Sequence, residues 1–511
     1  MEPARLEHGR GNKNAAIIDG KIDREAILYG ITLKERPADW SVLQEQEGSA
    51  KAHLVGTFAV HPAALSVGVE SVTPCYRLMN EEDNLPVIPW MPLEPFQIQD
   101  RDRFQGSFET DIDLPIGGPY RLETTLLTKS TRESTTWLYR GDTALHLLVG
   151  DLFVIAGQSN SAGHAWDYCP DPPHLCVHLL RNRGSWDLAT HPLNESTDAG
   201  SLPNEEMGIP GISPYLAFGK KYYALTGHPV GLIQTALGGS TISQWNPDSG
   251  PLYRNMLERI RMSGQKPRGV LWYQGCNDTD NGEAPRYLTD FHYFVACLRR
   301  DLGYSIPIFT MQLNRQIESG SDIGWGLIRE AQRRAAIEIP GIEIMTTTNL
   351  PLSDTLHNSA AGNVVLGQRL AMQVAKRLVG VRIPDFTPPQ LCDADLLTEE
   401  MCQGRHLDGI WMELCFHHVH SWFILYSHSG EKSGFSLSDR DGEIPILKIR
   451  ADVQDRNRMY LCLQRKPGKD AVLSFCWQAD PVSQPPVDAV TYLPPVSFYR
   501  LHVPAHHCDN T

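Results

Sequence analysis

The sequence lacks any uninterrupted apolar run long enough to span a bilayer, which takes about 20 residues. Its most apolar segment, residues 144–157, is interrupted by His146 and Asp151. The first sixteen residues, MEPARLEHGRGNKNAA, lack the apolar stretch of a secretory signal peptide. We therefore expect neither a membrane-spanning segment nor a leader sequence.

Basic residues and paired cysteines are also scarce. The 46 Lys and Arg residues are outnumbered by 60 Asp and Glu residues, which gives a net charge of −14. An acidic chain of this kind is a poor partner for nucleic acid or for an anionic membrane surface. The 11 cysteines are scattered, with no C-x-x-C pair. This pattern favours reduced thiols over a disulfide framework or a structural zinc site, and we expect a cytoplasmic protein.

The chain has 511 residues and a hydrophobic content of 41%, enough for two to four domains with sizeable cores. Residues 1–144 contain short alternating segments separated by Pro and Gly, which predicts a β-rich, sandwich-like domain. Residues 390–511 show the same pattern after a proline-rich linker at 380–389. We expect these two β-rich regions to flank a different domain at 145–389.

That middle segment alternates strands with helices. Apolar strands are predicted at 152–156, 230–235, 269–273, 306–311 and 342–346, and amphipathic helices at 214–225, 288–302, 326–338 and 361–378. Such alternation is typical of an α/β domain with a parallel sheet and helices on both faces.

Polar motifs follow four of these strands, in chain order. They are GQSN at 157–160, LGGST at 237–241, WYQGCND at 272–278 and DTLH at 354–357. Open α/β sheets bind ligands at the carboxyl ends of their strands, so the four motifs are predicted to meet at one edge. Any one of them alone would be an ordinary turn or helix cap.

Together the motifs indicate a serine esterase. Ser159 is placed as a nucleophile, and His357 can act as its general base when Asp354 orients the imidazole. Asp354 is the only carboxylate between Glu343 and His357. The glycine pair offers backbone N–H groups to an oxyanion, and Gln274 and Asn277 offer amide side chains.

These motifs resemble the four blocks of the SGNH hydrolases and, more narrowly, the sialate O-acetylesterase (SASA) family of carbohydrate acetylesterases. The supporting matches are VGD at 149–151, HPVGLI at 228–233, REAQ at 329–332, GQRLA at 367–371 and FYR at 498–500. Cys276, Asn358 and Ser161 depart from the family, which usually has an acidic residue, proline and methionine at these positions.

The resemblance implies a fold, an activity and a set of site residues. The fold would be an SGNH-type three-layer α/β/α sandwich flanked by β-rich regions. Ser159, Asp354 and His357 would form the catalytic triad, and acetyl esters would be hydrolysed through an acyl-serine without metal or cofactor. The oxyanion hole would comprise the backbone N–H groups of Ser159 and Gly239 with Asn277 or Gln274.

Further residues near the site are candidates for substrate binding. We expect Gln158, Gly238, Trp245 and Arg315 to contact the substrate, and His164 and Trp166 lie close by in the sequence; for the tryptophans, core packing is an equal alternative. Aromatic and Arg side chains suit the recognition of polyols and carboxylates.

The substrate implied by the family is an O-acetylated sialic acid, as a small sugar. Acetylated xylan or another plant oligosaccharide is the alternative substrate. A catalytically inactive carbohydrate-binding protein on an esterase scaffold is the alternative of another class. The sequence leaves the oligomeric state open.

Overall fold

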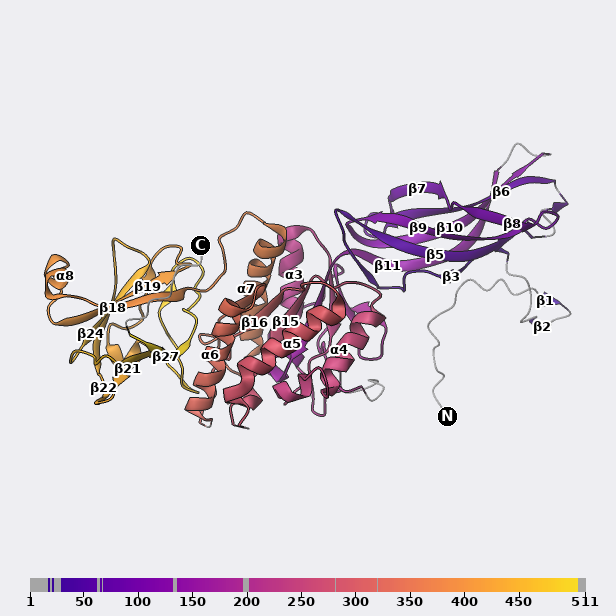
Figure 1. The fold of residues 1–511 in the computed structure, drawn as a ribbon. Helices are drawn as coiled ribbons and strands as arrows, with labels where there is room; N and C mark the ends of the chain where they lie inside the picture. The colour runs from indigo at the N-terminus through magenta and orange to yellow at the C-terminus, as the bar shows by residue number, and fades with distance from the viewer. Residues whose placement is uncertain are drawn as a thin grey trace.

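The computed structural model describes residues 17–18, 21–22, 29–61, 65–66, 68–131, 136–195, 202–280, 282–318 and 320–503. Figure 1 shows an N-terminal β region, a central α/β region and a C-terminal β region arranged in a row. No helix in the described residues is long and apolar enough to cross a membrane. The ten cysteines among these residues are all free thiols.

Two mainly antiparallel sheets form the N-terminal region, and a short ribbon of β1 (Ile17–Ile18) and β2 (Lys21–Ile22) precedes them. One sheet has the order β3 (Gly30–Glu35), β5 (Ser49–Ala59), β9 (Gln105–Pro115), β8 (Phe96–Asp100). The other contains β7 (Pro86–Pro92), β6 (Val69–Asn80), β10 (Gly117–Ser130) and the first part of β11 (Thr136–Gly157), with β4 (Val42–Gln44) beside β11.

A single apolar core joins these two sheets. Leu54 and Leu114 of the first sheet and Leu78 and Leu122 of the second are fully buried in it. Alternate residues of β5 are buried, as expected for a strand with one face on the core. The predicted β-rich N-terminal region is therefore confirmed for the described residues; residues 1–16 lie outside them.

One long strand connects the N-terminal region to the central one. β11 pairs antiparallel with β10 up to Val149 and then, from Asp151 onward, parallel with β14 (Val230–Gln234) and β15 (Gly269–Tyr273). At the changeover, a Cβ on Gly150 would collide with the backbone of Pro229. A single strand thus crosses the domain boundary predicted at residue 144.

The central sheet follows the order β13 (Trp186–Leu188), β12 (Val177–Leu180), β14, β11, β15, β16 (Ile308–Met311), β17 (Ile342–Met345). All neighbouring strands are parallel except β13. Every residue of β14 and β15 is buried, which requires cover on both faces of the sheet. The α/β class predicted from the alternating pattern is confirmed.

Five long helices supply that cover: α3 (Tyr215–Thr226), α4 (Pro251–Met262), α5 (Tyr287–Leu302), α6 (Asp322–Glu338) and α7 (Ala360–Val379). Packing places α3 beside α7 and α5 beside α6. Ser321 and Ser359 cap the last two helices by accepting the N–H of Gly324 and Gly362, which explains where they start. Four of the five helices were predicted; α4 was not.

Short elements complete the central region. They are α2 (Ser159–Ala162) and the single turns η1 (Ile242–Trp245), η2 (Cys276–Asp278) and η3 (Ala284–Arg286). Of these, α2, η1 and η2 follow the carboxyl ends of strands β11, β14 and β15, respectively.

The C-terminal region is again β-rich, as predicted. Its two main sheets are β18 (Gln390–Leu396), β19 (Ile410–His417), β24 (Arg458–Leu463), β23 (Ile446–Ala451), and β22 (Gly442–Glu443), β21 (Phe435–Asp439), β25 (Val472–Phe475), β27 (Phe498–His502). A pair of β20 (Phe423–Ile424) and β26 (Val487–Asp488), helix α8 (Glu399–Gly404) and turn η4 (Gly430–Lys432) accompany them.

A buried arginine fastens this region to the central one. Arg329 of α6 is fully buried, and its guanidinium donates to the carbonyls of Cys476 and Asn314 at 2.8 and 2.7 Å. Burial lowers the pKa of Arg329 to about 10, so the group is still charged near neutrality. The two regions therefore share a polar contact inside their interface.

Candidate active site

The nucleophile candidate lies where β11 gives way to α2. Gly157 has φ +128°, and a Cβ there would collide with the carbonyl of Tyr273, so the sharp turn requires glycine. Ser159 is the first residue of α2 and is only 4% exposed. The first N–H groups of a helix have no intrahelical acceptor, which makes the Ser159 N–H a donor for a substrate oxygen.

The base candidate is held by its predicted partner. Asp354 Oδ2 lies 2.7 Å from His357 Nδ1, while Oδ1 accepts the N–H groups of Leu356 and His357 at 2.8 and 2.6 Å. Burial alone would raise the pKa of Asp354, but these donors outweigh it and hold the pKa below its usual value. The ionised carboxylate fixes Nδ1, so Nε2 is the nitrogen that can take a proton.

A hydrogen bond between neighbouring residues brings the nucleophile and base loops together. The N–H of Asn358 donates to Asn160 Oδ1 at 2.9 Å, and these residues directly follow His357 and Ser159. Asn314 Nδ2 in turn donates to Asn358 Oδ1 at 2.6 Å. Proline, common in the family at position 358, has no N–H, so this bond depends on the departure that the sequence shows.

The glycine loop after β14 is tied to the same turn. The N–H of Leu237 and the hydroxyl of Ser240 both donate to the carbonyl of Gly157, at 3.1 and 3.3 Å. Gly239 has φ +70°, and its N–H finds no acceptor among the described residues. The Gly239 N–H is therefore available, and its role as an oxyanion donor stays a prediction.

The N–H of Gly238, unlike that of Gly239, already has an acceptor among the described residues. Its N–H donates to Glu206 Oε1 at 2.6 Å, and a Cβ at Gly238 would lie 2.7 Å from Glu206 Oε2 and 2.9 Å from His164 Nε2. The substrate-binding role predicted for Gly238 is corrected: its N–H holds the loop in place, and the absence of a side chain leaves room for Glu206 and His164.

The loop after β15 is clamped by a buried glutamine. Gln158 is fully buried, and its Oε1 accepts the N–H groups of Gly275 and Cys276, both at 2.8 Å. Asn277 Nδ2 donates to the carbonyl of Gly239 at 2.7 Å, which places this amide beside the predicted oxyanion donors. Gln158 therefore acts on the site through the loop, which corrects the substrate contact predicted for it.

Gln274 and Trp245 also have structural roles. Both N–H groups of the buried Gln274 amide are used, one on the carbonyl of Ser240 and one on Asp278 Oδ2, so this amide offers no hydrogen to an oxyanion. Trp245 is fully buried against Trp272, with ring centroids 5.1 Å apart. Core packing, the alternative considered for Trp245, replaces the predicted substrate contact.

Two further groups near the site can be assigned. Cys276 is buried, and burial raises the pKa of its thiol to about 12, so it is no competing nucleophile. Arg315 follows β16 and pairs with Asp480 of the C-terminal region at 3.4 Å. Its role in substrate binding stays a prediction.

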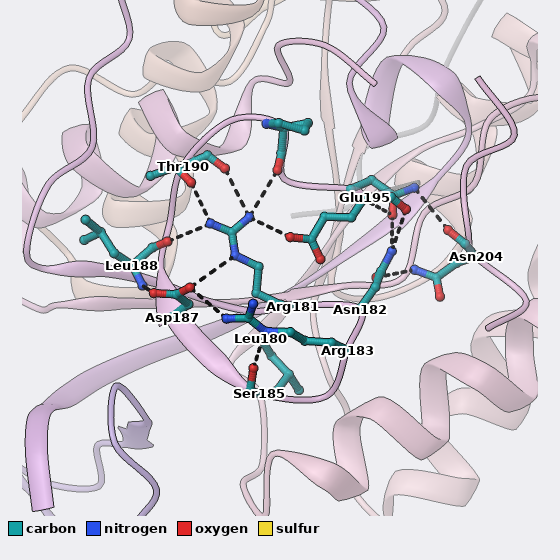
Figure 2. Close-up of polar contacts among 12 residues, drawn as sticks. Leu180, Arg181, Asn182, Arg183, Ser185, Asp187, Leu188, Thr190, Glu195 and Asn204 are labelled. Carbon is teal, nitrogen blue, oxygen red and sulfur yellow. Dashed lines mark hydrogen bonds and ion pairs between the residues drawn. The ribbon is translucent and has the colours of Figure 1, made fainter. Parts of the chain in front are cut away.

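Sequence reasoning missed Glu206, a buried carboxylate at the site. Asn194 Nδ2 donates to Glu206 Oε1 at 3.2 Å, and the loop that carries Asn194 is organised by Arg181 (Figure 2). Arg181 donates to the carbonyl of Leu188 at 3.0 Å and pairs with Glu195 at 3.1 Å. No motif or periodicity marks this loop, so the sequence carried no signal for Glu206.

Rings surround the base on one side. The imidazole of His164 lies 5.1 Å from that of His357, and the indole of Trp166 lies 6.3 Å from it, between ring centroids. Glu206 Oε2 lies 3.2 Å from His164 Nε2. In sum, the described residues place Ser159, the Asp354–His357 pair and the N–H groups of Ser159 and Gly239 after strands of the central sheet.

Comparison with solved structures supports the fold. A carbohydrate acetylesterase from Xanthomonas citri has a TM-score of 0.56 at 18% identity, over 90% of this chain and 97% of that one. A protein from Arabidopsis thaliana matches 45% of this chain and 99% of its own at 26% identity and TM-score 0.40. NanS matches 45% of this chain and 96% of its own, at 16% identity and a TM-score of 0.37. No curated protein sequence matches the chain.

A family model covers the central region and includes Ser159, Gly239, Asn277, Asp354 and His357. It is described as carbohydrate esterase, sialic acid-specific acetylesterase, and it matches residues 149–376. The resemblance to the SASA family of carbohydrate acetylesterases, predicted from the four motifs, is thus confirmed for this central part of the chain.

Proposed function

We propose that this chain is a serine esterase that removes O-acetyl groups from carbohydrates. One observation carries the proposal: the Asp354–His357 pair is anchored to the Ser159 loop through the bond from the Asn358 N–H to Asn160 Oδ1. An oriented imidazole beside a serine at a helix N-terminus is the arrangement that activates a hydroxyl for acyl transfer.

The reaction would take place in two halves. Ser159 Oγ attacks the acetyl carbonyl carbon while His357 Nε2 takes its proton, and the N–H groups of Ser159 and Gly239 stabilise the oxyanion. The bond to the sugar oxygen then breaks, and His357 returns the proton to that oxygen. In the second half, water attacks the acetyl-serine carbonyl while His357 Nε2 takes its proton; the bond from the acetyl carbon to Ser159 Oγ then breaks, His357 returns the proton to Oγ, and acetate is released.

Asn277 supports the oxyanion donors in this proposal. Its amide binds the carbonyl of Gly239 at 2.7 Å and thereby fixes the peptide next to the donating N–H. Donors that are already oriented need no rearrangement as charge develops on the carbonyl oxygen. No metal or cofactor takes part in the proposed reaction.

Two substrate classes follow from the resemblance. The family description names sialic acid, and a neutral acetylated oligosaccharide, such as one derived from xylan, is the alternative. Both reactions would use the same triad, so the substrate is decided by the surface beside it.

Acetate release from O-acetylated sialic acid and from acetylated xylo-oligosaccharide tests the reaction, with wild type and Ser159→Ala compared directly. We expect wild type to act on at least one substrate and Ser159→Ala to lose that activity. Activity that survives in Ser159→Ala would refute the proposed nucleophile. No release from either substrate by wild type would favour the non-catalytic carbohydrate-binding alternative.

A further inference from the structure

Large apolar side chains are exposed next to the proposed catalytic base. Trp166 is 61% exposed, Tyr168 89% and Ile209 79%. They border a hollow of about 840 Å³, whose wall also includes Pro192 and Ile212. This volume lies within the range of about 300–1,000 Å³ usual for small-molecule sites.

The hollow is framed by two paired backbone segments. The N–H of Gly211 donates to the carbonyl of Gly163 at 2.7 Å, and the N–H of Ile212 donates to that of Ala165 at 2.9 Å. A Cβ on Gly211 would collide with the carbonyl of Ala165, so the close pairing depends on this glycine. The segment that leaves α2 is thereby fixed against the segment that precedes α3.

Trp166 is held in one orientation although most of it faces solvent. Its indole Nε1 donates to the carbonyl of Ile209 at 2.8 Å, and the edge of the ring would lie 3.0 Å from a Cβ on Gly211. A fixed aromatic face loses little conformational entropy on binding a ligand. An exposed indole fixed in this way is suited to contact with a flat apolar ligand surface.

The indole continues the proposed active site. Its ring centroid lies 6.3 Å from that of His357 and 6.1 Å from that of His164, which lies between Trp166 and Glu206. A sugar whose acetyl group reached Ser159 would therefore extend past His357 toward Trp166. The hollow, which Trp166 lines, is therefore a candidate site for the alcohol part of the ester.

Charge distinguishes the two candidate substrate classes. Among the described residues, those that line the hollow include Asp167 and His191 but no Lys or Arg. Asp167 accepts the N–H of Ala360 at 2.9 Å. A sialic acid carboxylate would find neither Lys nor Arg among these lining residues and would face the carboxylate of Asp167.

Arg315 does not supply the missing cation to this hollow. It is on the loop after β16, its guanidinium pairs with Asp480, and it is not among the lining residues. An uncharged sugar has no such requirement, because the axial C–H groups of a pyranose ring present an apolar face to an aromatic ring.

We propose that Trp166 and the hollow beside it bind an uncharged acetylated pyranoside, with the sugar ring stacked on the indole. The inference rests on the proposed function, because it identifies the alcohol that the esterase releases. It selects the neutral oligosaccharide over sialic acid.

Steady-state acetate release from acetylated xylo-oligosaccharide, O-acetylated sialic acid and 4-nitrophenyl acetate tests this proposal. Trp166→Ala is compared with Trp422→Ala, a matched control because Trp422 is 60% exposed in the C-terminal region. We expect wild-type kcat/KM for the xylo-oligosaccharide to exceed that for sialic acid at least about tenfold. Trp166→Ala should raise KM for the xylo-oligosaccharide about tenfold more than for 4-nitrophenyl acetate.

Further variants separate stacking from folding. Trp166→Phe keeps an aromatic face and should recover most of the affinity for the xylo-oligosaccharide, whereas Trp422→Ala should leave the ratio of the two KM values at its wild-type level. A higher wild-type kcat/KM for sialic acid would overturn the inference. So would an equal rise in KM for the xylo-oligosaccharide and for 4-nitrophenyl acetate in Trp166→Ala. Hydrolysis of 4-nitrophenyl acetate by Ser159→Ala would instead refute the proposed function.

Discussion

The two edges of the central parallel sheet each carry an Asp–His pair, and the pairs are built differently. At the carboxyl edge, Asp354 Oδ2 lies 2.7 Å from His357 Nδ1; at the opposite edge, Asp151 Oδ2 lies 2.9 Å from His228 Nδ1. The two distances are nearly equal. The surroundings of each pair determine what it can do.

The pair at the opposite edge is closed. Asp151 is fully buried, and it also binds the hydroxyl of Tyr222 at 2.7 Å, the amide of Gln44 at 3.0 Å and the guanidinium of Arg268 at 2.8 Å. Burial would raise the pKa of Asp151, but these partners outweigh it and lower the pKa. Asp151 already pairs with a cation, Arg268. Its bond to the amide of Gln44 joins the N-terminal region to the central sheet.

The pair at the carboxyl edge is open. The Asp354 side chain is 32% exposed, against 0% for Asp151, whereas the two imidazoles are about equally exposed, at 16% for His357 and 17% for His228. In the proposed reaction, the pair whose carboxylate is partly exposed supplies the base. Where the carboxylate is fully buried and also pairs with a guanidinium, the same Asp–His arrangement holds the fold together.

Removal of the two imidazoles is the strongest test of this difference. His357→Ala should lower kcat/KM for acetyl esters by about 10⁴-fold or more, because the serine loses its base. His228→Ala should leave kcat/KM near the wild-type value at temperatures where the variant is folded. Equal losses of kcat/KM in both variants would contradict the assignment of the open pair as catalytic.

Replacing each aspartate by asparagine should lower kcat for Asp354 and the free energy of unfolding for Asp151. Asp354→Asn should lower kcat about 10²–10⁴-fold, because the imidazole loses its orientation and the imidazolium loses its counter-charge. The measurement is kcat with 4-nitrophenyl acetate at pH 7. Wild-type kcat in Asp354→Asn would exclude Asp354 from the triad.

Asp151→Asn should act on folding. The substitution leaves Arg268 paired with Glu45 alone and should lower the free energy of unfolding by up to about 3 kcal/mol. Urea denaturation measures this effect, with the exposed Asp102→Asn as control, for which a change within about 0.5 kcal/mol is expected. Unchanged stability in Asp151→Asn would show that the closed pair does not hold the fold.

Lowering the pH should remove the contribution of Asp151 to the free energy of unfolding. The pKa of Asp151 in the folded protein is below its usual value of 3.8, so its stabilisation is present above that value and is lost as the pH falls through the lower, folded-state pKa. The stability difference between wild type and Asp151→Asn should therefore stay constant from pH 8 to about pH 5 and narrow below about pH 4. A stability difference that widens as the pH falls would contradict the lowered pKa of Asp151.

The smallest effect is expected at Glu206, which acts on the open edge through other residues. Glu206→Gln keeps an oxygen for the Gly238 N–H but removes the charge, and should cost about 1 kcal/mol of transition-state stabilisation, roughly fivefold in kcat/KM. The neighbouring Glu205→Gln is the control and should show no change. A loss in Glu206→Gln as large as that in Asp354→Asn would move Glu206 into the catalytic machinery itself.

Sequence patterns predicted the open edge better than the closed one. Strand–helix alternation located the parallel strands, and polar motifs at their ends identified Ser159, Asp354, His357 and Gly239, because those positions depend on local spacing. Gln158, Gln274 and Trp245 also lie in or beside these motifs, but sequence spacing cannot tell a side chain that faces the site from one that supports it.

Contacts between distant segments escaped prediction. Glu206 meets Gly238 across 32 positions, and Arg268 meets Asp151 across 117. Such pairs follow from the way the chain crosses the sheet, and no periodicity marks them. For the same reason β11 was predicted only in part, since its first half belongs to the N-terminal region.

Labelling with a serine-reactive fluorophosphonate tests the central claim most directly, because it needs no knowledge of the sugar. The site of labelling is located by peptide mass mapping in wild type, Ser159→Ala, His357→Ala and His228→Ala. We expect the label on Ser159 in wild type and His228→Ala, and no label in Ser159→Ala or His357→Ala. Labelling of a different residue, or of Ser159 at an undiminished rate in His357→Ala, would contradict a nucleophile activated by the open Asp–His pair.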